Sequence, residues 1–369
     1  MKAGLLKYGI GLGLLALVIW LNWNARPGKS TPEGQNLAIV GGGLVNGWEV
    51  ATRTTPGLGE TLSRPIHILP MLVGFVLCAG ALLLTIVRWH LLVRAQNLDF
   101  PLRSAMRLGL VGYFLNTFMP GSVGGDILKA VAISREQSRR AVAVSTIIID
   151  RAIGLWAIVW FVALAGGVFW LLDDPVLTNS PQLQRLVILS SQVILVTVLI
   201  WVGLGFLPER RSERISLWFR TIPRLGGSLS EMWDAARLYR RQRRAVFLAL
   251  ALSLVSHCGW ISAFHFAART FEVPDAATDL PTYSQHMLIV PVGMTLQALF
   301  PAPGGVGGGE AAFAWLYSVV GRPAANGILA CLAQRVISWS LGLIGYLFYL
   351  RMKGVDRVPT PAERALAEG

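Results

Sequence analysis

The heptapeptide PGSVGGD at residues 120–126 recurs, with one added glycine, as PGGVGGGE at residues 303–310. The two copies share the pattern P-G-x-V-G-G-acid and begin 183 residues apart, which is half of the 369-residue chain. Each copy follows a short apolar stretch, Ser104–Met119 in the first half and Met287–Phe300 in the second. A glycine-rich pattern alone arises easily by chance, so the case for a repeat depends on what surrounds the two copies.

The surroundings of the two copies also match. An arginine follows the final acidic residue by 25 positions in both halves: Arg151 after Asp126, and Arg335 after Glu310. An amide side chain lies four positions before a proline in both halves, as Asn116 and as Gln297. Several features in the same order at half-chain separation predict an internal repeat.

The composition indicates a membrane protein. Hydrophobic residues make up 54% of the chain and charged residues only 14%, whereas soluble domains average about 25% charged residues. The net charge of +13 would suggest nucleic-acid binding in a polar protein. In so apolar a chain it is better explained by basic loops beside membrane spans, so we expect no nucleic-acid partner.

Six apolar runs approach the roughly 20 residues that a membrane span needs. They are Leu5–Leu21, Ile68–Val87, Ala152–Leu172, Leu186–Leu207, Ala245–Ala268 and Gly327–Leu350. No A-x-A-like cleavage site follows the first run, so we predict a retained helix rather than a secretory signal. The stretches that precede the two glycine-rich copies are too short to cross, and we expect them to form re-entrant hairpins.

The loops predict the orientation. Residues 208–244 contain ten arginines and four acidic residues, which is typical of the cytoplasmic side. The termini are also basic, so both are expected in the cytoplasm, and residues 22–66 form an external loop. One hairpin then enters from the cytoplasm and the other from outside. We expect the inner membrane of a prokaryote.

These features predict an all-α polytopic membrane protein with about six transmembrane helices and two re-entrant hairpins. The halves, residues 1–185 and 186–369, have opposite orientation in the membrane. Such an inverted repeat is common among secondary transporters.

Three stretches resemble the lysylphosphatidylglycerol synthetase transmembrane (flippase) family. They are NTFMPGSVGGD at 116–126 with Lys129, DRAIG at 150–154, and PAPGGVGGGE at 301–310. The resemblance covers roughly residues 70–350 and implies a protein that moves a lipid between leaflets. The best-known members add a soluble aminoacyl-transfer domain at the C-terminus. Only 19 residues follow Leu350 here, so we expect no lipid-charging enzyme.

The predicted headgroup-binding or gating residues lie at the breaks and on the helices that follow them. Glycine lets a headgroup approach the backbone closely, the start of a helix attracts phosphate, and charges inside a span are costly unless they are functional or paired. The residues are Asn116, Pro120, Gly121, Gly124, Gly125, Asp126, Lys129, Asp150, Arg151, Pro303, Gly304, Gly305, Gly307, Gly308, Glu310 and Arg335.

Several roles stay open. Asp126 and Glu310 either cap helices or take part in headgroup or proton chemistry, and these roles can coexist. Lys129 either contacts a phosphate or extends to the membrane interface. Arg151 and Arg335 either bind an anionic headgroup or form structural ion pairs, and we expect those pairs to be with Asp126 and Glu310.

Other polar residues in the spans receive structural interpretations. His257 and His265 lie on roughly the same face of one helix, where bundle histidines with ordinary hydrogen bonds are favoured over proton coupling. Arg88 and Arg94 are predicted to be interface anchors.

Three classes of function remain. The leading one is a transporter of an anionic phospholipid or a polyprenyl-phosphate lipid. The others are a membrane-embedded lipid-modifying enzyme and an accessory subunit of a separately encoded lipid or glycosyl transferase. The sequence contains no H-E-x-x-H or G-x-S-x-G motif and no cluster with metal-ligand spacing. We therefore expect no catalytic residues, metal or cofactor.

Overall fold

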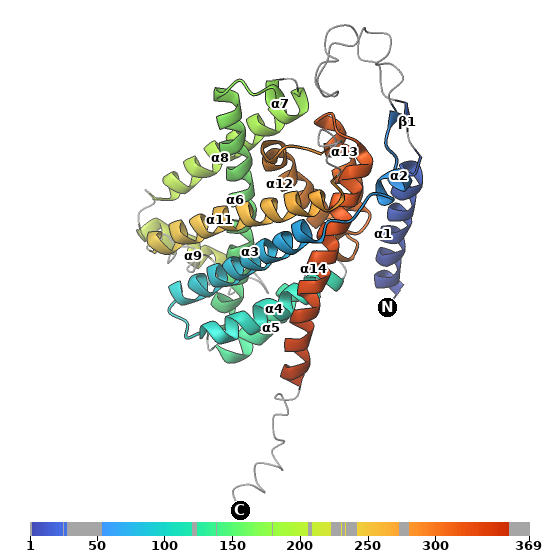
Figure 1. Cartoon of the computed structure of the whole chain (residues 1–369). Coiled ribbons are helices and arrows are strands. Elements are labelled where there is room, and N and C mark those ends of the chain that lie inside the picture. The colour runs from blue at the N-terminus through green and yellow to red at the C-terminus, as the bar shows by residue number, and fades with distance from the viewer. Residues whose placement is uncertain are drawn as a thin grey trace, which may run out of the picture.

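The fold is a bundle of helices, seen in a computed structural model of the chain (Figure 1). The described residues are 2–24, 26–27, 54–119, 124–137, 139–178, 180–205, 209–222, 230, 233, 242–272 and 280–353. Most of the predicted external loop and much of the basic loop lie outside these ranges. The strands described are β1 (Arg26–Pro27) and β2 (Thr54–Thr55), which pair antiparallel.

The helices divide into long apolar ones and shorter ones beside them. The first half contains α1 (Lys2–Leu21), α2 (Leu58–Leu62), α3 (Ile68–Ala95), α4 (Leu102–Phe118), α5 (Gly124–Glu136), α6 (Arg140–Leu171) and α7 (Pro175–Thr178). The second half contains α8 (Pro181–Gly205), α9 (Glu209–Arg220), α11 (Arg243–Ala268), η3 (Arg269–Phe271), α12 (Tyr283–Leu299), η5 (Pro303–Gly305), α13 (Gly308–Val319) and α14 (Ala324–Lys353).

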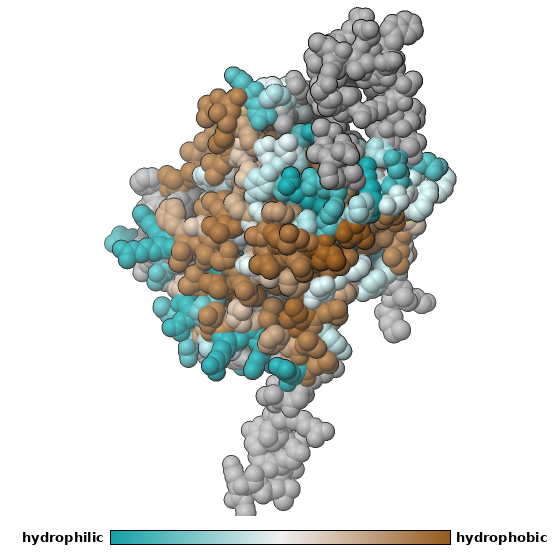
Figure 2. Space-filling view, in the orientation of Figure 1, coloured by the Kyte–Doolittle hydropathy of each residue, from teal (hydrophilic) through white to brown (hydrophobic). Residues whose placement is uncertain are grey.

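Five described helices are long and apolar enough to cross a membrane, namely α3, α6, α8, α11 and α14. They confirm an all-α membrane protein. The first predicted span is a shorter apolar helix, Leu6–Leu21 within α1. Figure 2 shows apolar surface across the middle of the visible face, with hydrophilic residues toward its edges. Large side chains of α8 such as Leu195 and Leu199 are exposed, as lipid-facing residues are.

Small residues bring α3 and α11 together in antiparallel contact. A side chain at Gly74 would meet the Ala263 carbonyl, and one at Gly259 would meet Ala81. The Ser256 hydroxyl donates to the Ala81 carbonyl at 2.9 Å. Helices in lipid associate through such close approaches and hydrogen bonds, because the lipid itself is as apolar as the side chains.

The most buried spanning helix is α14. Its Gly345 faces the Leu110 carbonyl of α4, and its Gly342 faces the ring of Phe118. In Figure 1 the pair α4 and α5 lies toward one end of α14, and the pair α12 and α13 lies toward the other. One helix of each pair, α4 and α13, therefore packs directly against α14.

The contact between α3 and α11 gives a test with a control on the same helix. Gly74→Leu should lower the thermal midpoint of the detergent-solubilised protein, because overpacking a tight contact costs about 1–3 kcal/mol. Gly80→Leu should leave the midpoint nearly unchanged, since nothing lies within 4 Å of its Cβ position. Equal midpoints for the two variants would contradict the helix packing described.

Candidate functional site

The break between α12 and α13 is a tight turn of glycines. Gly304, Gly305 and Gly307 have φ angles of 54°, 67° and 82°. These left-handed values strain other residues. Pro303 is buried at the start of the turn, and Gly308 lies against the Phe300 ring. The sequence keeps glycine where the backbone requires it.

A buried ion pair holds this turn. The Arg335 guanidinium binds both carboxylate oxygens of Glu310, and the two side chains are 5% and 0% exposed. The same guanidinium donates to the carbonyls of Gly304 and Gly305 at 2.7 and 2.9 Å. Glu310 also accepts the Gly307 N–H at 2.8 Å and so caps α13. The predicted pairing is confirmed, and capping and pairing coexist.

The break between α4 and α5 has a related geometry. Pro120 and Gly121 lie outside the described residues, whereas Gly124 and Gly125 begin α5. The Asn116 side-chain oxygen accepts the Gly125 N–H at 2.7 Å. The two backbones are in contact here, since a Cβ at Gly125 would overlap Gly112 of α4. An amide also serves the second break, where Gln297 donates to the Gly304 carbonyl at 3.0 Å.

The second predicted ion pair is also present. Arg151 donates from Nε and Nη2 to the two oxygens of Asp126 at 2.7 and 2.9 Å. The Arg151 side chain is 50% exposed and that of Asp126 15%. The two halves therefore contain the same acid–arginine pair, which is buried in the second half and partly exposed in the first.

Asp150 has a partner that the sequence did not predict. The Arg88 guanidinium donates to its two carboxylate oxygens at 2.8 and 3.0 Å, and to the Ser253 hydroxyl at 2.8 Å. Both side chains are buried, so the prediction that Arg88 anchors the interface is wrong. Arg94 does lie at the surface, where it pairs with Asp99. The charge of Asp150, costly inside a span, was the signal that a cation must lie nearby.

Lys129 lies between these two pairs. Its amine interacts electrostatically with Asp126, Asp150, Arg151 and Arg88. The same amine lies 4.9 Å from the centroid of the Trp89 ring. Within the described part of the chain, Lys129 takes part in no ion pair. Three basic side chains thus face two carboxylates, and each carboxylate is already paired with an arginine.

The second break touches the first half directly. A Cβ at Gly304 would lie 2.9 Å from the Thr117 carbonyl near the end of α4. The Tyr8 hydroxyl of α1 donates to the Phe118 carbonyl at 2.7 Å, and Gly11 of the same helix lies against Val306. The second break therefore contacts the C-terminal end of α4, and α1 contacts both.

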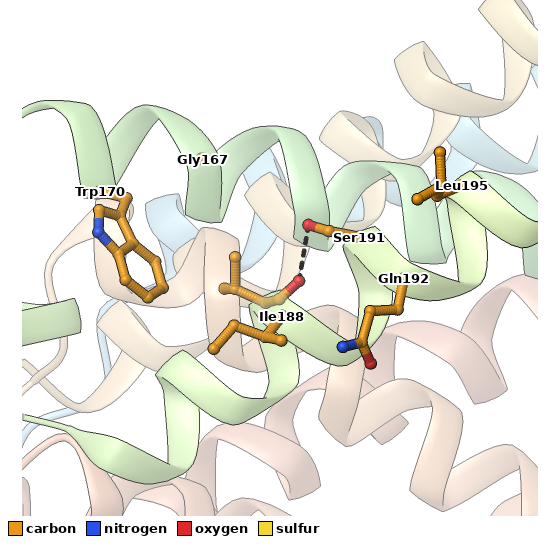
Figure 3. Close-up of a pocket in the computed structure, with 7 residues that line it drawn as sticks. Gly167, Trp170, Ile188, Ser191, Gln192 and Leu195 are labelled. Carbon is orange, nitrogen blue, oxygen red and sulfur yellow. Dashed lines mark hydrogen bonds between the residues drawn. The ribbon is translucent and has the colours of Figure 1, made fainter.

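A separate apolar groove of about 340 Å³ lies between α6 and α8. Figure 3 shows Trp170, Ile188 and Leu195 around it, with the Ser191 hydroxyl donating to the Val187 carbonyl at 2.8 Å. Gly167 in its wall is 16 residues from Arg151, about 24 Å along α6. The groove is therefore distinct from the charged cluster. The described residues contain no group of three His, Cys, Asp or Glu that would hold a metal ion.

Comparison with known proteins identifies relatives of this bundle. A model of the family described as lysylphosphatidylglycerol synthase TM region matches residues 56–345. A UPF0104 membrane protein of Pyrococcus horikoshii is 24% identical over 296 residues, which cover 76% of this chain and 86% of the relative. No solved structure is significantly similar to the chain.

The unequal exposure of the two ion pairs predicts unequal effects on stability. Arg335→Leu should destabilise the protein by about 3–5 kcal/mol, because it leaves the Glu310 carboxylate buried without a cation. Arg151→Leu should cost clearly less, since that pair is partly open to its surroundings. Thermal midpoints of the two purified variants provide the measurement. A midpoint for Arg335→Leu at or above that of Arg151→Leu would contradict this assignment.

Proposed function

The chain belongs to the lysylphosphatidylglycerol synthase TM region family, and on that premise we propose that it moves a phosphate-bearing lipid between the two leaflets of a membrane. The observation that carries the proposal is a basic side chain, Lys129, that has no carboxylate partner among the described residues and lies beside the half-exposed Arg151. A charge inside a bundle is expensive and marks a functional site by default. An anionic headgroup would balance it.

The first half supplies the means to bind a phosphate. The helix α5 begins at Gly124, and its first N–H groups and positive dipole end favour an anion. Lys129 lies on the same helix, one turn after Asp126. Arg151 is held by Asp126 in a fixed orientation, with half of its side chain exposed. In this proposal the phosphate is held by Lys129, Arg151 and the backbone N–H of Gly124, while the Gly125 N–H stays bonded to Asn116.

We further propose that the two halves form an inverted repeat with re-entrant hairpins. The matched ion pairs support this, as do the two helix pairs at opposite ends of α14 (Figure 1). The broken backbone of each hairpin would line a watery cavity, because unpaired N–H and C=O groups are not tolerated in lipid. Lipid movement would then be alternating access of one half against the other, with a state open at the first break and sealed at the second.

The orientation is proposed from the basic loop and termini, and the cargo and the partner are proposed from the transport function. We place the protein in the inner membrane of a prokaryote with both termini in the cytoplasm. The cargo is an anionic phospholipid or a polyprenyl-phosphate lipid, and the protein is a carrier rather than an enzyme. A separately encoded lipid or glycosyl transferase is the partner expected to supply or consume the cargo.

Lys129→Gln tests the headgroup site. In proteoliposomes it should slow the movement of fluorescent phosphatidylglycerol about tenfold or more, because a hydrogen bond to a charged group contributes about 1.5–3 kcal/mol. Lys7→Gln is the control, since Lys7 is exposed on α1, a helix that contributes no residue to the charged cluster. Equal rates for the two variants would exclude Lys129 from headgroup binding. A wild-type rate no faster than that of protein-free vesicles would refute lipid transport.

A labelling experiment tests the inverted repeat. In a background in which Cys78, Cys258 and Cys331 are replaced by alanine, Val123→Cys and Val306→Cys should react with a membrane-impermeant maleimide from opposite sides. We expect Val123→Cys to react from the cytoplasmic side. Labelling of both positions from one side would remove the inverted-repeat proposal.

A further inference from the structure

Three buried side chains from three different helices form an unbroken chain of hydrogen bonds. The Nδ1 atoms of His265 (α11) and His286 (α12) are 2.8 Å apart. The Nε2 atom of His286 is 2.8 Å from the hydroxyl oxygen of Tyr317 (α13). His286 and Tyr317 have no exposed surface, and His265 is 7% exposed.

Packing alone does not require this chain. Phe264 and Phe313 stack beside it with ring centroids 4.2 Å apart, and Leu316 is buried in the same apolar cluster. Aromatic or aliphatic side chains would fill the space of the histidines without any polar group to satisfy. Polar networks in such surroundings are costly unless every member is paired. Two imidazoles in series are, however, well suited to transferring protons.

The geometry allows two hydrogen-bond orders. In one, His265 Nδ1–H donates to His286 Nδ1, and His286 Nε2–H donates to the Tyr317 oxygen. In the other, Tyr317 O–H donates to His286 Nε2, and His286 Nδ1–H donates to His265 Nδ1. A proton arriving at His265 Nε2 converts the first order to the second. Each N–H bond that breaks forms the next bond, and the original Tyr317 proton leaves at the far end.

His265 is the outer end of the hydrogen-bonded chain and lies near the C-terminus of α11. The edge of the Tyr283 ring meets His265 at a centroid distance of 5.2 Å, and Tyr283 is 38% exposed. Arg269 follows on the next turn and is partly exposed, 3.6 Å from Glu272. A proton can therefore enter from the surface at this point.

The inner end approaches the buried ion pair of Arg335 and Glu310. Cys331 of α14 lies in the same buried cluster as Tyr317 and interacts with it electrostatically. The same thiol interacts with Glu310 and with Arg335, which is one turn later on α14. Cys331 therefore lies in the buried cluster of Tyr317 and also interacts with Glu310, which places the Glu310 carboxylate beyond the inner end of the hydrogen-bonded chain.

We propose that His265, His286 and Tyr317 conduct protons between the outer end of α11 and Glu310. The conduction stands without the lipid-transport function, and only its use to drive lipid movement depends on that function. Protonation of Glu310 removes the negative charge that pairs with Arg335. The guanidinium, which also holds the Gly304 and Gly305 carbonyls, then becomes a cation available to a phosphate at the second break.

The charged and titratable groups around this route are few in the described ranges. On α11, η3 and the residue after it they are Cys258, His265, Arg269 and Glu272. On α12 they are Tyr283 and His286. The helices α13 and α14 contribute Glu310, Tyr317, Cys331 and Arg335. The helix α6 contributes apolar side chains, Phe161 and Val162, to the cluster.

Proton flux is measured with the full-length protein in vesicles of phosphatidylcholine and phosphatidylglycerol that contain a pH-sensitive dye. An imposed pH gradient drives the flux while valinomycin and potassium clamp the voltage. In this proposal a proton that reaches Glu310 leaves at the contact between Gly304 and Thr117, toward the first break and the opposite side. We therefore expect the wild-type protein to take up protons faster than protein-free vesicles. His286→Gln and Tyr317→Phe should reduce this excess at least about tenfold, since a positioned proton-transfer group contributes about 10²–10⁴ in rate.

The matched control is His257→Gln. His257 lies on the same helix as His265, but its Nε2 is 3.2 Å from the Gly154 carbonyl, outside the chain. It should keep the wild-type flux. Tyr317→Phe removes only one oxygen, so we expect this variant to fold. The comparison of wild-type protein with protein-free vesicles tests the proposal without any variant.

The outcomes separate this proposal from lipid transport. Movement of fluorescent phosphatidylglycerol is followed in the same vesicles. If proton flux depends on His286 while the lipid does not move, the proton route stands and lipid transport fails. If the lipid moves but His286→Gln and Tyr317→Phe take up protons as the wild type does, the proton route is overturned. A wild-type proton flux equal to that of protein-free vesicles overturns it as well.

Discussion

A charge inside an apolar bundle needs an opposite charge, and the pair of Arg335 and Glu310 shows how much structure depends on that requirement. Leaving either side chain alone in the bundle would cost several kcal/mol. Together they are nearly inaccessible, and the guanidinium has hydrogen bonds left for the Gly304 and Gly305 carbonyls. One ion pair therefore fixes the turn between α12 and α13 and joins that turn to α14.

The first half uses the same interaction differently. Asp126 and Arg151 form the same pair with the same spacing, but half of the Arg151 side chain is exposed. The first half also has Lys129 beside the pair, and the second half has no equivalent basic residue, since Phe313 occupies the matching position. The second half instead places two histidines and a tyrosine behind its ion pair. The matched pairs support a shared architecture. The differences support different roles for the two breaks: an anion binds at the first, and protons are transferred at the second.

The local sequence predicted the features that occur in both halves and the features whose placement in a membrane has a clear free-energy cost. The 25-residue spacing predicted both acid–arginine pairs, because the same helix–break–helix geometry occurs twice. The long apolar runs predicted the spanning helices. Arg88 was misassigned because it lies near the basic end of α3, where interface anchors are common, and only the packing of α3 against α6 and α11 brings it to Asp150 and Ser253. His286 and Tyr317 had no sequence signal, since their contacts join residues 21 and 31 positions apart across different helices.

The most direct measurement is native mass spectrometry of the protein released from its own membrane in a mild detergent. If Lys129, beside Asp126 and Arg151, is part of a headgroup site, the wild-type protein will retain one phosphate-bearing lipid. That lipid will be lost from Lys129→Gln and kept by Lys7→Gln. Retention of neutral lipids only, or equal retention of the anionic lipid by both variants, would contradict the central claim.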